Sequence, residues 1–463
     1  MIRLFNHYLN RRVLYQVLFD FGLIVALMTG VVVMFFEGVK EPGSLVSLSA
    51  AHGVSLAAFV FVINTASGFY RPAVHRSLSQ SCARAALASL FALPLAYAIA
   101  RMLPSENSGN APMTWAAMVG VVGVILHRVY AAHSASASRA RSRVLILGTG
   151  PAADAVSRTL RASDPSVEVV GYLRSPNERQ VVVPESQVFD AHHSLAETAR
   201  QSHVNEVVVA LTERRGGSMP MRELLDCKIQ GVTVCDLATH FEKTLGQIRL
   251  DYVNAGWLIF GDGFNQGMVR TAMKRVFDVA CALILLVLSL PVMLLTALMV
   301  SLESKGPVFY SQERVGFNGR TFRVVKFRSM RSDAEVDGKP RWAQAGDDRI
   351  TRVGRVIRKL RIDELPQLFN VLKGEMSLVG PRPERPFFVD QLVKDIPYYA
   401  VRHSVKPGLT GWAQVRYHYG STVADSQQKL QYDLYYVKNH TLFLDMLILF
   451  ETVAVVLTGK GAH

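Results

Sequence analysis

The sequence predicts a membrane α/β protein, because four long apolar stretches come first and an alternating strand and helix pattern follows them. The apolar stretches are long enough to cross a hydrocarbon core of about 30 Å, and they lie at 13–36, 45–70, 82–103 and 113–132. The alternation is typical of a parallel sheet covered by helices. We predict a four-helix transmembrane domain at 1–135, a Rossmann-like cytoplasmic domain at 141–245, a linker at 246–270, and a re-entrant membrane helix hairpin with a small α-rich domain at 271–463.

Arginines at the ends of these apolar stretches predict the orientation. They precede the first stretch, surround the connection between the second and third, and follow the fourth: Arg3, Arg11, Arg12, Arg71, Arg76, Arg84, Arg139, Arg141 and Arg143. Because positively charged connections stay in the cytoplasm, we expect both ends of this domain there. The first stretch is too long for the apolar region of a cleaved signal peptide, so we expect it to be retained.

The overall charge favours a membrane surface over nucleic acid. The net charge is +14, but no DNA- or RNA-reading motif is visible, and anionic lipid headgroups attract such a surface. The four cysteines are Cys82, Cys227, Cys235 and Cys281. Their spacing matches no metal or disulfide pattern, so we expect reduced packing residues.

A glycine-rich loop marks the start of the Rossmann-like domain. Gly148-Thr149-Gly150-Pro151-Ala152-Ala153 fits G-x-G-x-x-A between a strand and a helix, where backbone N–H groups can hold a phosphate. Gly148 and Gly150 are therefore candidate nucleotide-binding residues, and Glu168 stands where a ribose-binding acid could fall. The unit has only about 100 residues and lacks a second mononucleotide half. A structural or regulatory module is the alternative.

The apolar segment 276–302 is expected to enter the membrane without crossing it. Lys274 and Arg275 flank one end and Lys305 the other, so the charges favour neither side. Pro291 in its middle removes a backbone hydrogen bond and favours a sharp bend. A re-entrant hairpin kinked at Pro291 satisfies both observations.

Two adjacent acids follow a run of basic residues. Asp363 and Glu364 stand just before Pro366, which can open a helix, and after Arg349, Arg352, Arg355, Arg358, Lys359 and Arg361. Neighbouring cations favour ionised carboxylates, which can act as a nucleophile or as metal ligands. The alternative is a solvated charged turn at a helix start. The basic run also predicts an amphipathic helix, whose apolar face meets either the membrane interface or the protein core.

Further motifs suit phosphate binding. Lys326-Phe327-Arg328-Ser329-Met330 carries two cations, and Gly380-Pro381-Arg382-Pro383-Glu384 presents one arginine between two prolines. Proline fixes φ, so an arginine held this way can clamp a phosphate. Lys406 to Trp412 forms another rigid, glycine-containing turn.

These motifs, in this order, resemble the bacterial sugar transferase family of monotopic phosphoglycosyl transferases. The resemblance covers about 270–460 and rests on Lys274-Arg275-x-Phe277-Asp278, Lys326 to Met330, Asp363-Glu364-Leu365-Pro366-Gln367-Leu368, Gly380 to Pro383, and Pro407 to Gly411. With its N-terminal domains the chain resembles the long exopolysaccharide-type members. Trp257 to Phe264 further resembles a linker of the branch associated with exosortase systems.

The resemblance implies a chemistry and a location. It implies transfer of a sugar 1-phosphate from a UDP-sugar to polyprenyl (undecaprenyl) phosphate with release of UMP, the first step of exopolysaccharide synthesis at the bacterial inner membrane. It makes Asp363 the nucleophile of a covalent phosphosugar intermediate and ties Glu364, with Asp363, to Mg²⁺. Arg358, Arg382, Lys326 and Arg328 are then the candidates for holding substrate phosphate. The family's serine before the hairpin proline is absent, since Leu290 precedes Pro291 and the serine is Ser289.

Other functions stay open at this point. One is a transferase that moves the sugar alone and releases UDP. Another is a membrane scaffold or nucleotide sensor with an inactive transferase domain, and a third is an NAD-dependent nucleotide-sugar enzyme built on Gly148 and Gly150. The transferred sugar and the formation of a homo-oligomer are not predicted.

Overall fold

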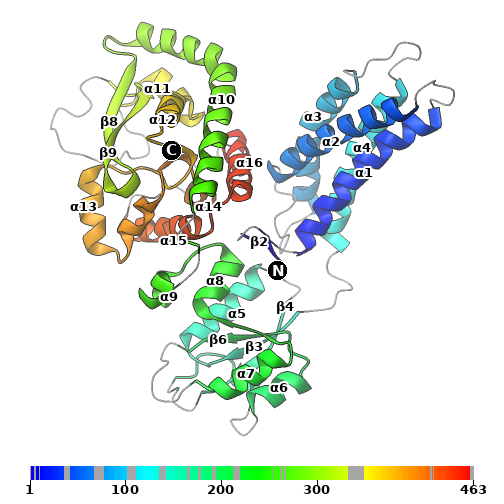
Figure 1. Ribbon diagram of the computed structural model, residues 1–463, viewed down its shortest axis with the longest axis vertical. Coiled ribbons are helices and arrows are strands. Elements are labelled where there is room, and N and C mark those ends of the chain that lie inside the picture. Colours follow the sequence, from blue (N-terminus) through cyan, green and yellow to red (C-terminus); the bar gives the residue numbers. More distant parts are fainter. Residues whose placement is uncertain are drawn as a thin grey trace. The chain divides into compact units, whose positions relative to one another are not determined.

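The computed structural model describes most of the chain (Figure 1). The described residues are 2–4, 7–9, 11–35, 42–66, 78–101, 111–134, 142–163, 167–175, 178, 180–189, 194–211, 219–253, 255–260, 263–264, 267–331, 349–417, 420 and 422–458. They form two compact units, one of Met1–Ile2 with Tyr8–Leu245 and one of Arg3–His7 with Gly246–His463. Part of the linker motif lies outside the described residues, namely Gly261 and Asp262.

The four N-terminal apolar stretches form a helix bundle. After two short strands, β1 (Ile2–Leu4) and β2 (His7–Leu9), come α1 (Arg11–Phe35), α2 (Pro42–Ala66), α3 (Leu78–Arg101) and α4 (Ala111–Ser134). Each helix packs on its neighbours, and their shared core includes Ile24, Met28, Leu56 and Val121. Arg128 donates to both carboxylate oxygens of the buried Asp20, at 2.7 and 2.6 Å. The helices are confirmed; within the described residues their apolar windows run for 10–17 residues each.

The middle domain has the predicted parallel sheet. Its strands are β3 (Ser142–Leu147), β4 (Val167–Leu173), β5 (Val188–Phe189), β6 (Glu206–Val209) and β7 (Thr233–Asp236). All neighbouring pairs are parallel, in the order β5-β4-β3-β6-β7. The chain therefore starts in the centre and reverses direction there, as in Rossmann-like folds.

Helices cover both faces of this sheet, as doubly wound folds require. They are α5 (Pro151–Ser163), α6 (Leu195–Gln201), α7 (Met221–Ile229) and α8 (Leu237–Leu245), with a 3₁₀ turn η1 at Glu185–Gln187. α5 contacts α8 on one side, and α6 contacts α7 on the other. Leu195 of α6 and Cys227 of α7 are fully buried against Leu147 and Val207.

The C-terminal unit contains one long helix together with shorter helices and two pairs of strands. It contains η2 (Leu250–Tyr252), α9 (Ala255–Phe260), α10 (Gly267–Glu303), β8 (Phe309–Val315), η3 (Phe317–Gly319), β9 (Thr321–Phe327), α11 (Arg352–Lys359), η4 (Ile362–Glu364), α12 (Gln367–Lys373), β10 (Ser377–Val379), α13 (Pro386–Asp395), η5 (Tyr399–Ser404), β11 (Gly408–Thr410), α14 (Trp412–Arg416), α15 (Val423–Asn439) and α16 (Leu442–Thr458). β8 and β9 form an antiparallel hairpin, and β10 pairs with β11 in parallel. The core includes Leu368, Leu378, Leu434 and Tyr435.

The predicted hairpin at 276–302 is one uninterrupted helix of 37 residues that contains Pro291. In Figure 1 this helix, α10, bends along its length before the chain enters β8, as expected where a proline removes a backbone hydrogen bond. The Ser289 hydroxyl donates to the Leu286 carbonyl at 3.4 Å. The predicted hairpin is therefore a single helix that bends; that this bent helix re-enters the membrane without crossing it stays a prediction.

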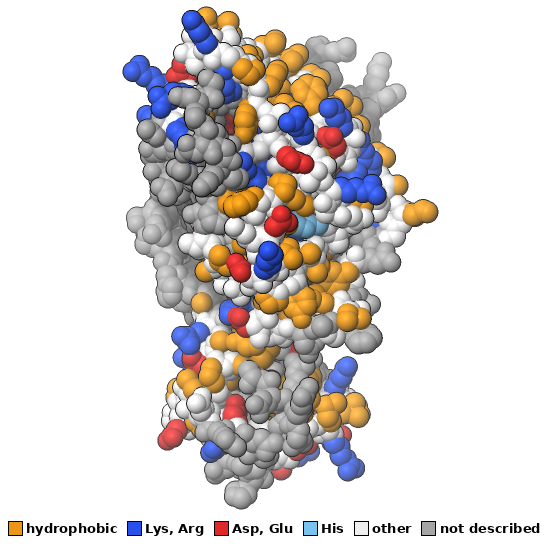
Figure 2. All heavy atoms as spheres, turned by 90° about the vertical axis from the view of Figure 1, so that its left-hand side faces the viewer, with side chains coloured by type: hydrophobic (Ala, Val, Ile, Leu, Met, Phe, Trp, Pro, Cys, Tyr) orange, Lys and Arg blue, Asp and Glu red, His pale blue; other side chains and the backbone are white. Residues whose placement is uncertain are grey.

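The surface of α10 is unusually apolar. Its most apolar window has a mean hydropathy of 2.8 and only 17% of it is buried. Val276, Val287 and Leu288 are each 71% exposed and Leu302 is 77% exposed. Figure 2 shows the face on the left of Figure 1, where hydrophobic side chains also lie exposed between Lys and Arg side chains. Contiguous exposed apolar surface of this kind marks a membrane or partner contact.

The amphipathic helix α11 has a mixed apolar face. Ile357 is buried and Val353 packs beside it against Met293 of α10 and Phe327 of β9. Leu360 is 46% exposed. The protein core therefore takes the centre of the apolar face, in agreement with the second of the two alternatives that the sequence left open.

Candidate active site

The two adjacent acids lie in η4, a single 3₁₀ turn after α11. Arg361, just before it, has φ +54°, a left-handed conformation that non-glycine residues adopt infrequently. This reversal turns Asp363 and Glu364 inward, where they are 9% and 7% exposed. Pro366 then precedes the helix α12, as predicted. The alternative of a solvated charged turn is wrong, because both carboxylates are buried.

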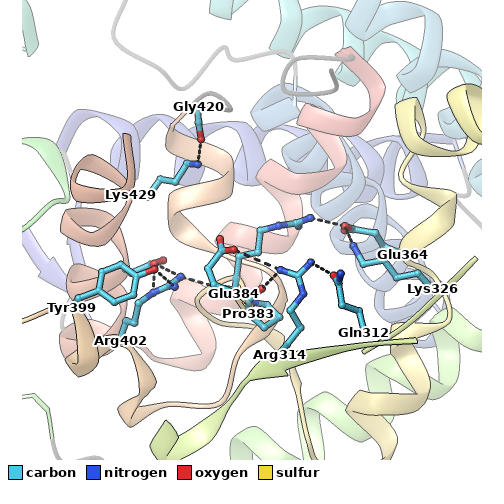
Figure 3. A network of polar contacts seen from close by, with 12 residues as sticks. Gln312, Arg314, Lys326, Glu364, Pro383, Glu384, Tyr399, Arg402, Gly420 and Lys429 are labelled. Atoms are coloured by element: carbon cyan, nitrogen blue, oxygen red, sulfur yellow. Dashed lines mark hydrogen bonds and ion pairs between the residues drawn. The ribbon is translucent and has the colours of Figure 1, made fainter. Parts of the chain in front are cut away.

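Two cations from distant parts of the chain converge on one oxygen of Glu364. Lys326 of β9 places Nζ 2.8 Å from Glu364 Oε1, and Arg382 places Nη2 at the same distance from the same atom. Arg361 Nη1 lies 3.7 Å from Oε2. Figure 3 shows Lys326 and Glu364 pointing toward one another. Charge-assisted hydrogen bonds of this kind are about twice as strong as neutral ones.

The two acids differ in proton affinity. Burial alone would raise the pKa of Glu364, but the charges of Arg382, Lys326 and Arg361 outweigh it and hold that pKa well below its ordinary value. Burial, together with the negative charge of Glu364, raises the pKa of Asp363 to about 6, although Lys326 and other cations oppose this. The prediction that neighbouring arginines keep both acids strongly ionised therefore holds for Glu364 only.

Asp363 is the acid left open. Within the described part of the chain, its carboxylate forms neither a hydrogen bond nor an ion pair. The cations that the sequence placed near both acids are directed to Glu364 instead. A carboxylate that is free of an ion pair is a more reactive nucleophile than one held in an ion pair.

Arg382 is held by a second, fully buried layer. Arg402 of η5 donates from Nη2 to the Arg382 carbonyl oxygen at 2.9 Å. The same guanidinium donates to Asp433 Oδ2 at 2.8 and 3.0 Å and to the Tyr399 hydroxyl at 2.9 Å. Burial raises the pKa of Tyr399 to about 12, so its hydroxyl stays protonated. Arg402 and Asp433 were not predicted as site residues, because they stand 31 residues apart in the sequence and belong to no recognisable motif.

Arg314 of β8 supports the neighbouring proline. It donates to the Pro383 carbonyl at 3.1 Å and to Gln312 Oε1 at 2.6 Å, and it lies 3.6 Å from Glu384. Figure 3 shows these side chains between Arg402 and Glu364. Backbone carbonyls on both sides of the turn are thus fixed, which restricts where the Arg382 guanidinium can reach.

The other two predicted phosphate ligands lie in different surroundings. Arg358, near the end of α11, is partly buried and its positive charge acts on Asp363. Arg328 is instead buried at the end of α10, where it donates to the carbonyls of Ser304 and Lys305 at 2.7 and 3.0 Å. The structure brings Arg358, Lys326 and Arg382 together around the acids; Arg328 binds free carbonyls at a helix end.

Comparisons with known proteins identify relatives of the C-terminal part of the chain. A family model described as bacterial sugar transferase matches residues 269–459, and one described as CoA-binding domain matches residues 65–219. The UDP-glucose:undecaprenyl-phosphate glucose-1-phosphate transferase of Caulobacter vibrioides is 46% identical over 240 residues, which are 50% of this chain and 89% of that protein. The chain belongs to the bacterial sugar transferase family.

Two further relatives extend the comparison. The UDP-N-acetylgalactosamine-undecaprenyl-phosphate N-acetylgalactosaminephosphotransferase of Aeromonas hydrophila is 46% identical over 242 residues, 52% of this chain. The undecaprenyl-phosphate glucose phosphotransferase of Komagataeibacter xylinus is 46% identical over 185 residues, 39% of this chain. The chain spans 56% of the length of the first and 35% of the second.

The acids of this sugar transferase fit a magnesium ion. Mg²⁺ binds proteins through one or two carboxylates and usually keeps waters or substrate phosphates as its other ligands. The Asp363 carboxylate has open oxygens, and Glu364 Oε2, which lies 3.7 Å from Arg361 Nη1, is not the oxygen that Lys326 and Arg382 share. Two hard oxygen donors on adjacent residues match what Mg²⁺ requires. Asp363 and Glu364 are the residues that would hold the ion, and its binding stays a prediction.

In the glycine loop of the middle domain, the backbone amides already donate to a carboxylate, that of Glu178. Gly148 has φ +128°, which favours glycine. The Glu178 carboxylate accepts from the Thr149 and Gly150 amides, at 2.7 and 2.8 Å, and from the Thr149 hydroxyl at 3.0 Å. A phosphate at these amides would have to displace Glu178. Glu168 is the second residue of β4 and lies at the amino end of the strands, whereas the glycine loop follows the carboxyl end of β3, so Glu168 is wrongly placed for a ribose-binding acid.

Proposed function

We propose that the protein transfers a sugar 1-phosphate from a UDP-sugar to undecaprenyl phosphate and releases UMP, as the first step of exopolysaccharide synthesis. The observation that carries this proposal is the contrast between the acids: Glu364 is bound by Lys326 and Arg382, whereas Asp363 is open. An ionised nucleophile and a neighbouring group of fixed cations are what attack on a phosphate requires.

The first half of the reaction forms a covalent intermediate. An Asp363 oxygen attacks the β-phosphorus of the UDP-sugar, and the bond from that phosphorus to the bridging oxygen breaks. UMP leaves with the bridging oxygen and its electron pair. The sugar phosphate stays on Asp363 as an acyl phosphate. Arg382 and Arg358 bind the phosphate oxygens, while Lys326 keeps Glu364 ionised and in place.

The second half returns the enzyme to its starting state. A phosphate oxygen of undecaprenyl phosphate attacks the same phosphorus, and the bond to Asp363 breaks. The product is the undecaprenyl diphosphate sugar, and Asp363 regains its carboxylate. When bound at Asp363 and Glu364, Mg²⁺ would neutralise phosphate charge as the anionic groups approach one another.

The exposed apolar surface supports a membrane location for this chemistry. The lipid acceptor lies in a bilayer, and α10 carries exposed Val276, Val287 and Leu302. We propose that α1 to α4 cross the inner membrane with both ends in the cytoplasm and that α10 enters only one leaflet. The site would then meet a soluble donor and a lipid acceptor in turn.

The chain's architecture supports placing it among the long exopolysaccharide-type members, with four apolar helices and a Rossmann-like domain before the transferase part. The motif from Trp257 to Phe264 favours the exosortase-associated branch within them. The relatives' names give both N-acetylgalactosamine and glucose, so a donor panel must include both.

The test uses the full chain in lipid nanodiscs with undecaprenyl phosphate, Mg²⁺ and a panel of UDP-sugars. We expect UMP from at least one donor, and without acceptor a covalent adduct with the mass of one sugar phosphate. Asp363→Asn should abolish both, whereas Asp395→Asn, at an exposed position in α13, should change neither. UDP as the product would indicate transfer of the sugar alone. Silence with every donor would favour the scaffold or sensor, and turnover by Asp363→Asn would refute the covalent route.

A further inference from the structure

A second group of chemically active side chains lies in the Rossmann-like domain. Glu206, Cys235 and His240 each bring one potential metal-ligand atom, and the three atoms lie within 4.8 Å of one another. The sequence analysis treated Cys235 as a packing residue, because its neighbours along the chain match no metal motif. The ligands come instead from two strands and a helix.

The fold explains how the three residues meet. Glu206 begins β6, and Cys235 lies in the adjacent strand β7. The register pairs Glu206 with Thr233 and Val208 with Cys235, so Glu206 and Cys235 lie on the same face of the sheet. His240 belongs to α8, which contacts both strands. Glu206 starts β6, whereas Cys235 lies next to the end of β7, so the group lies on the face of the sheet that α8 covers.

His240 has a buried ring nitrogen that is available to a ligand. Its side chain belongs to a residue that is only 2% exposed, and its Nε2 is buried without a hydrogen-bond partner. A buried polar atom without a partner costs free energy. An imidazole nitrogen that has no hydrogen-bond partner is available to bind a cation.

Cys235 and Glu206 complete the donor set. The Cys235 thiol donates to Glu206 Oε1 at 3.2 Å and is 7% exposed. Lys243 places Nζ 3.0 and 3.1 Å from the two carboxylate oxygens of Glu206. The ammonium group of Lys243 therefore pairs with the negative charge of Glu206. It does not bond to Nε2 of His240, which has no hydrogen-bond partner.

We propose that Glu206, Cys235 and His240 bind a divalent cation of the kind that accepts sulfur and nitrogen ligands, with Zn²⁺ as the prototype. Sulfur, imidazole and carboxylate together suit Zn²⁺, whereas Mg²⁺ prefers oxygen alone. Three protein ligands leave a fourth position for water. On binding, the Cys235 thiol gives its proton to solvent and Lys243 moves away from Glu206 with its charge retained. The site is separate from Asp363 and Glu364 and does not depend on the proposed transferase activity.

Co²⁺ is the probe, because a cobalt–thiolate bond has a charge-transfer absorption that oxygen and nitrogen ligands do not produce. The full chain, purified without a polyhistidine tag, is titrated with Co²⁺ in detergent. We expect one equivalent to produce the band and Zn²⁺ to bleach it. Cys235→Ala should abolish it, whereas Cys227→Ala, at a buried cysteine of the same domain outside the group, should retain it.

Two more variants separate the metal site from an ordinary packed ion pair. His240→Ala should weaken Co²⁺ binding by at least about tenfold. Lys243→Met should strengthen it by about tenfold, since the competing cation is gone, an estimate that follows from the usual worth of one charge-assisted contact. No band in the wild type overturns the proposal, as does a band that survives in Cys235→Ala or a Lys243→Met variant that binds more weakly.

Discussion

Arg402 donates a hydrogen bond to the backbone carbonyl of Arg382 while its guanidinium is also paired with Asp433. A buried ion pair thus fixes the turn that delivers Arg382 to Glu364. Without it the two prolines would still restrict φ, but the turn could shift as a whole. We infer that Arg402 positions Arg382 and does not itself touch substrate.

Replacing Arg402 by Met should therefore lower both stability and activity. Asp433 would be left as an uncompensated buried charge, which costs about 3–5 kcal/mol. Arg402→Met combined with Asp433→Leu should recover much of the melting temperature, because no charge is then unpaired. Activity, measured as UMP release, should stay low in both variants because Arg382 is no longer held. Recovery of activity together with stability would show that Arg402 serves the fold alone.

The pH dependence of the first half-reaction should report Asp363. The nucleophile must be ionised, and its pKa is about 6. The rate of UMP release without acceptor should consequently fall tenfold per pH unit well below 6 and level off above it. Lys326→Met removes a charge that lowers this pKa, so the midpoint should move to higher pH. Single-turnover rates between pH 5 and 8 test this, and Lys429→Met, which removes a lysine that does not act on Asp363, is the matched control.

The raised pKa of Asp363 also predicts that its ionised carboxylate destabilises the folded wild-type protein. A folded-state pKa above the ordinary value of an aspartate means that the folded state binds the proton more tightly than the unfolded chain. Stability contributed by protonated Asp363 is present at low pH and is lost as the pH rises through about 6. At pH 7.5, Asp363→Asn should accordingly raise the melting temperature, by about 2–4 °C for each kcal/mol by which the free energy of unfolding increases. The same variant should abolish transfer. A lower melting temperature would indicate that the cations around Asp363 stabilise its ionised form.

Sequence patterns singled out both acids and the three cations that the structure brings around them, Lys326, Arg358 and Arg382, whose roles in phosphate binding stay predictions. Asp363 and Glu364 follow one another, and Arg382 lies between prolines. The difference between the acids could not be predicted, since it depends on which carboxylate faces Lys326, from a strand 38 residues earlier in the chain. The buried pair of Arg402 and Asp433 depends in the same way on tertiary packing.

The parallel sheet was predictable for a related reason. Its strands are buried apolar runs that alternate with helical stretches, which is the pattern of a parallel sheet covered by helices. The occupant of the glycine loop was not predictable, because Glu178 lies in an irregular segment after β4. The continuity of α10 through Pro291 was also not predictable, since proline within an apolar run predicts a bend but does not show whether the helix stops.

Arg358 and Arg328 form a matched pair for the last prediction, since both were expected to bind phosphate from the sequence. Arg358→Met should reduce UMP release by about 10²-fold, the usual cost of removing one group that stabilises phosphate charge, with little change in melting temperature because its side chain is partly exposed. Arg328→Met removes two bonds to the carbonyls at the end of α10, each worth about 1.5–3 kcal/mol for a charged donor. It should lower the melting temperature clearly, and the activity of the fraction that remains folded should stay near the wild-type value. Steady-state UMP release at saturating donor, normalised to folded protein, separates the two; equal catalytic losses at equal stability would mean that Arg328 also reaches the substrate.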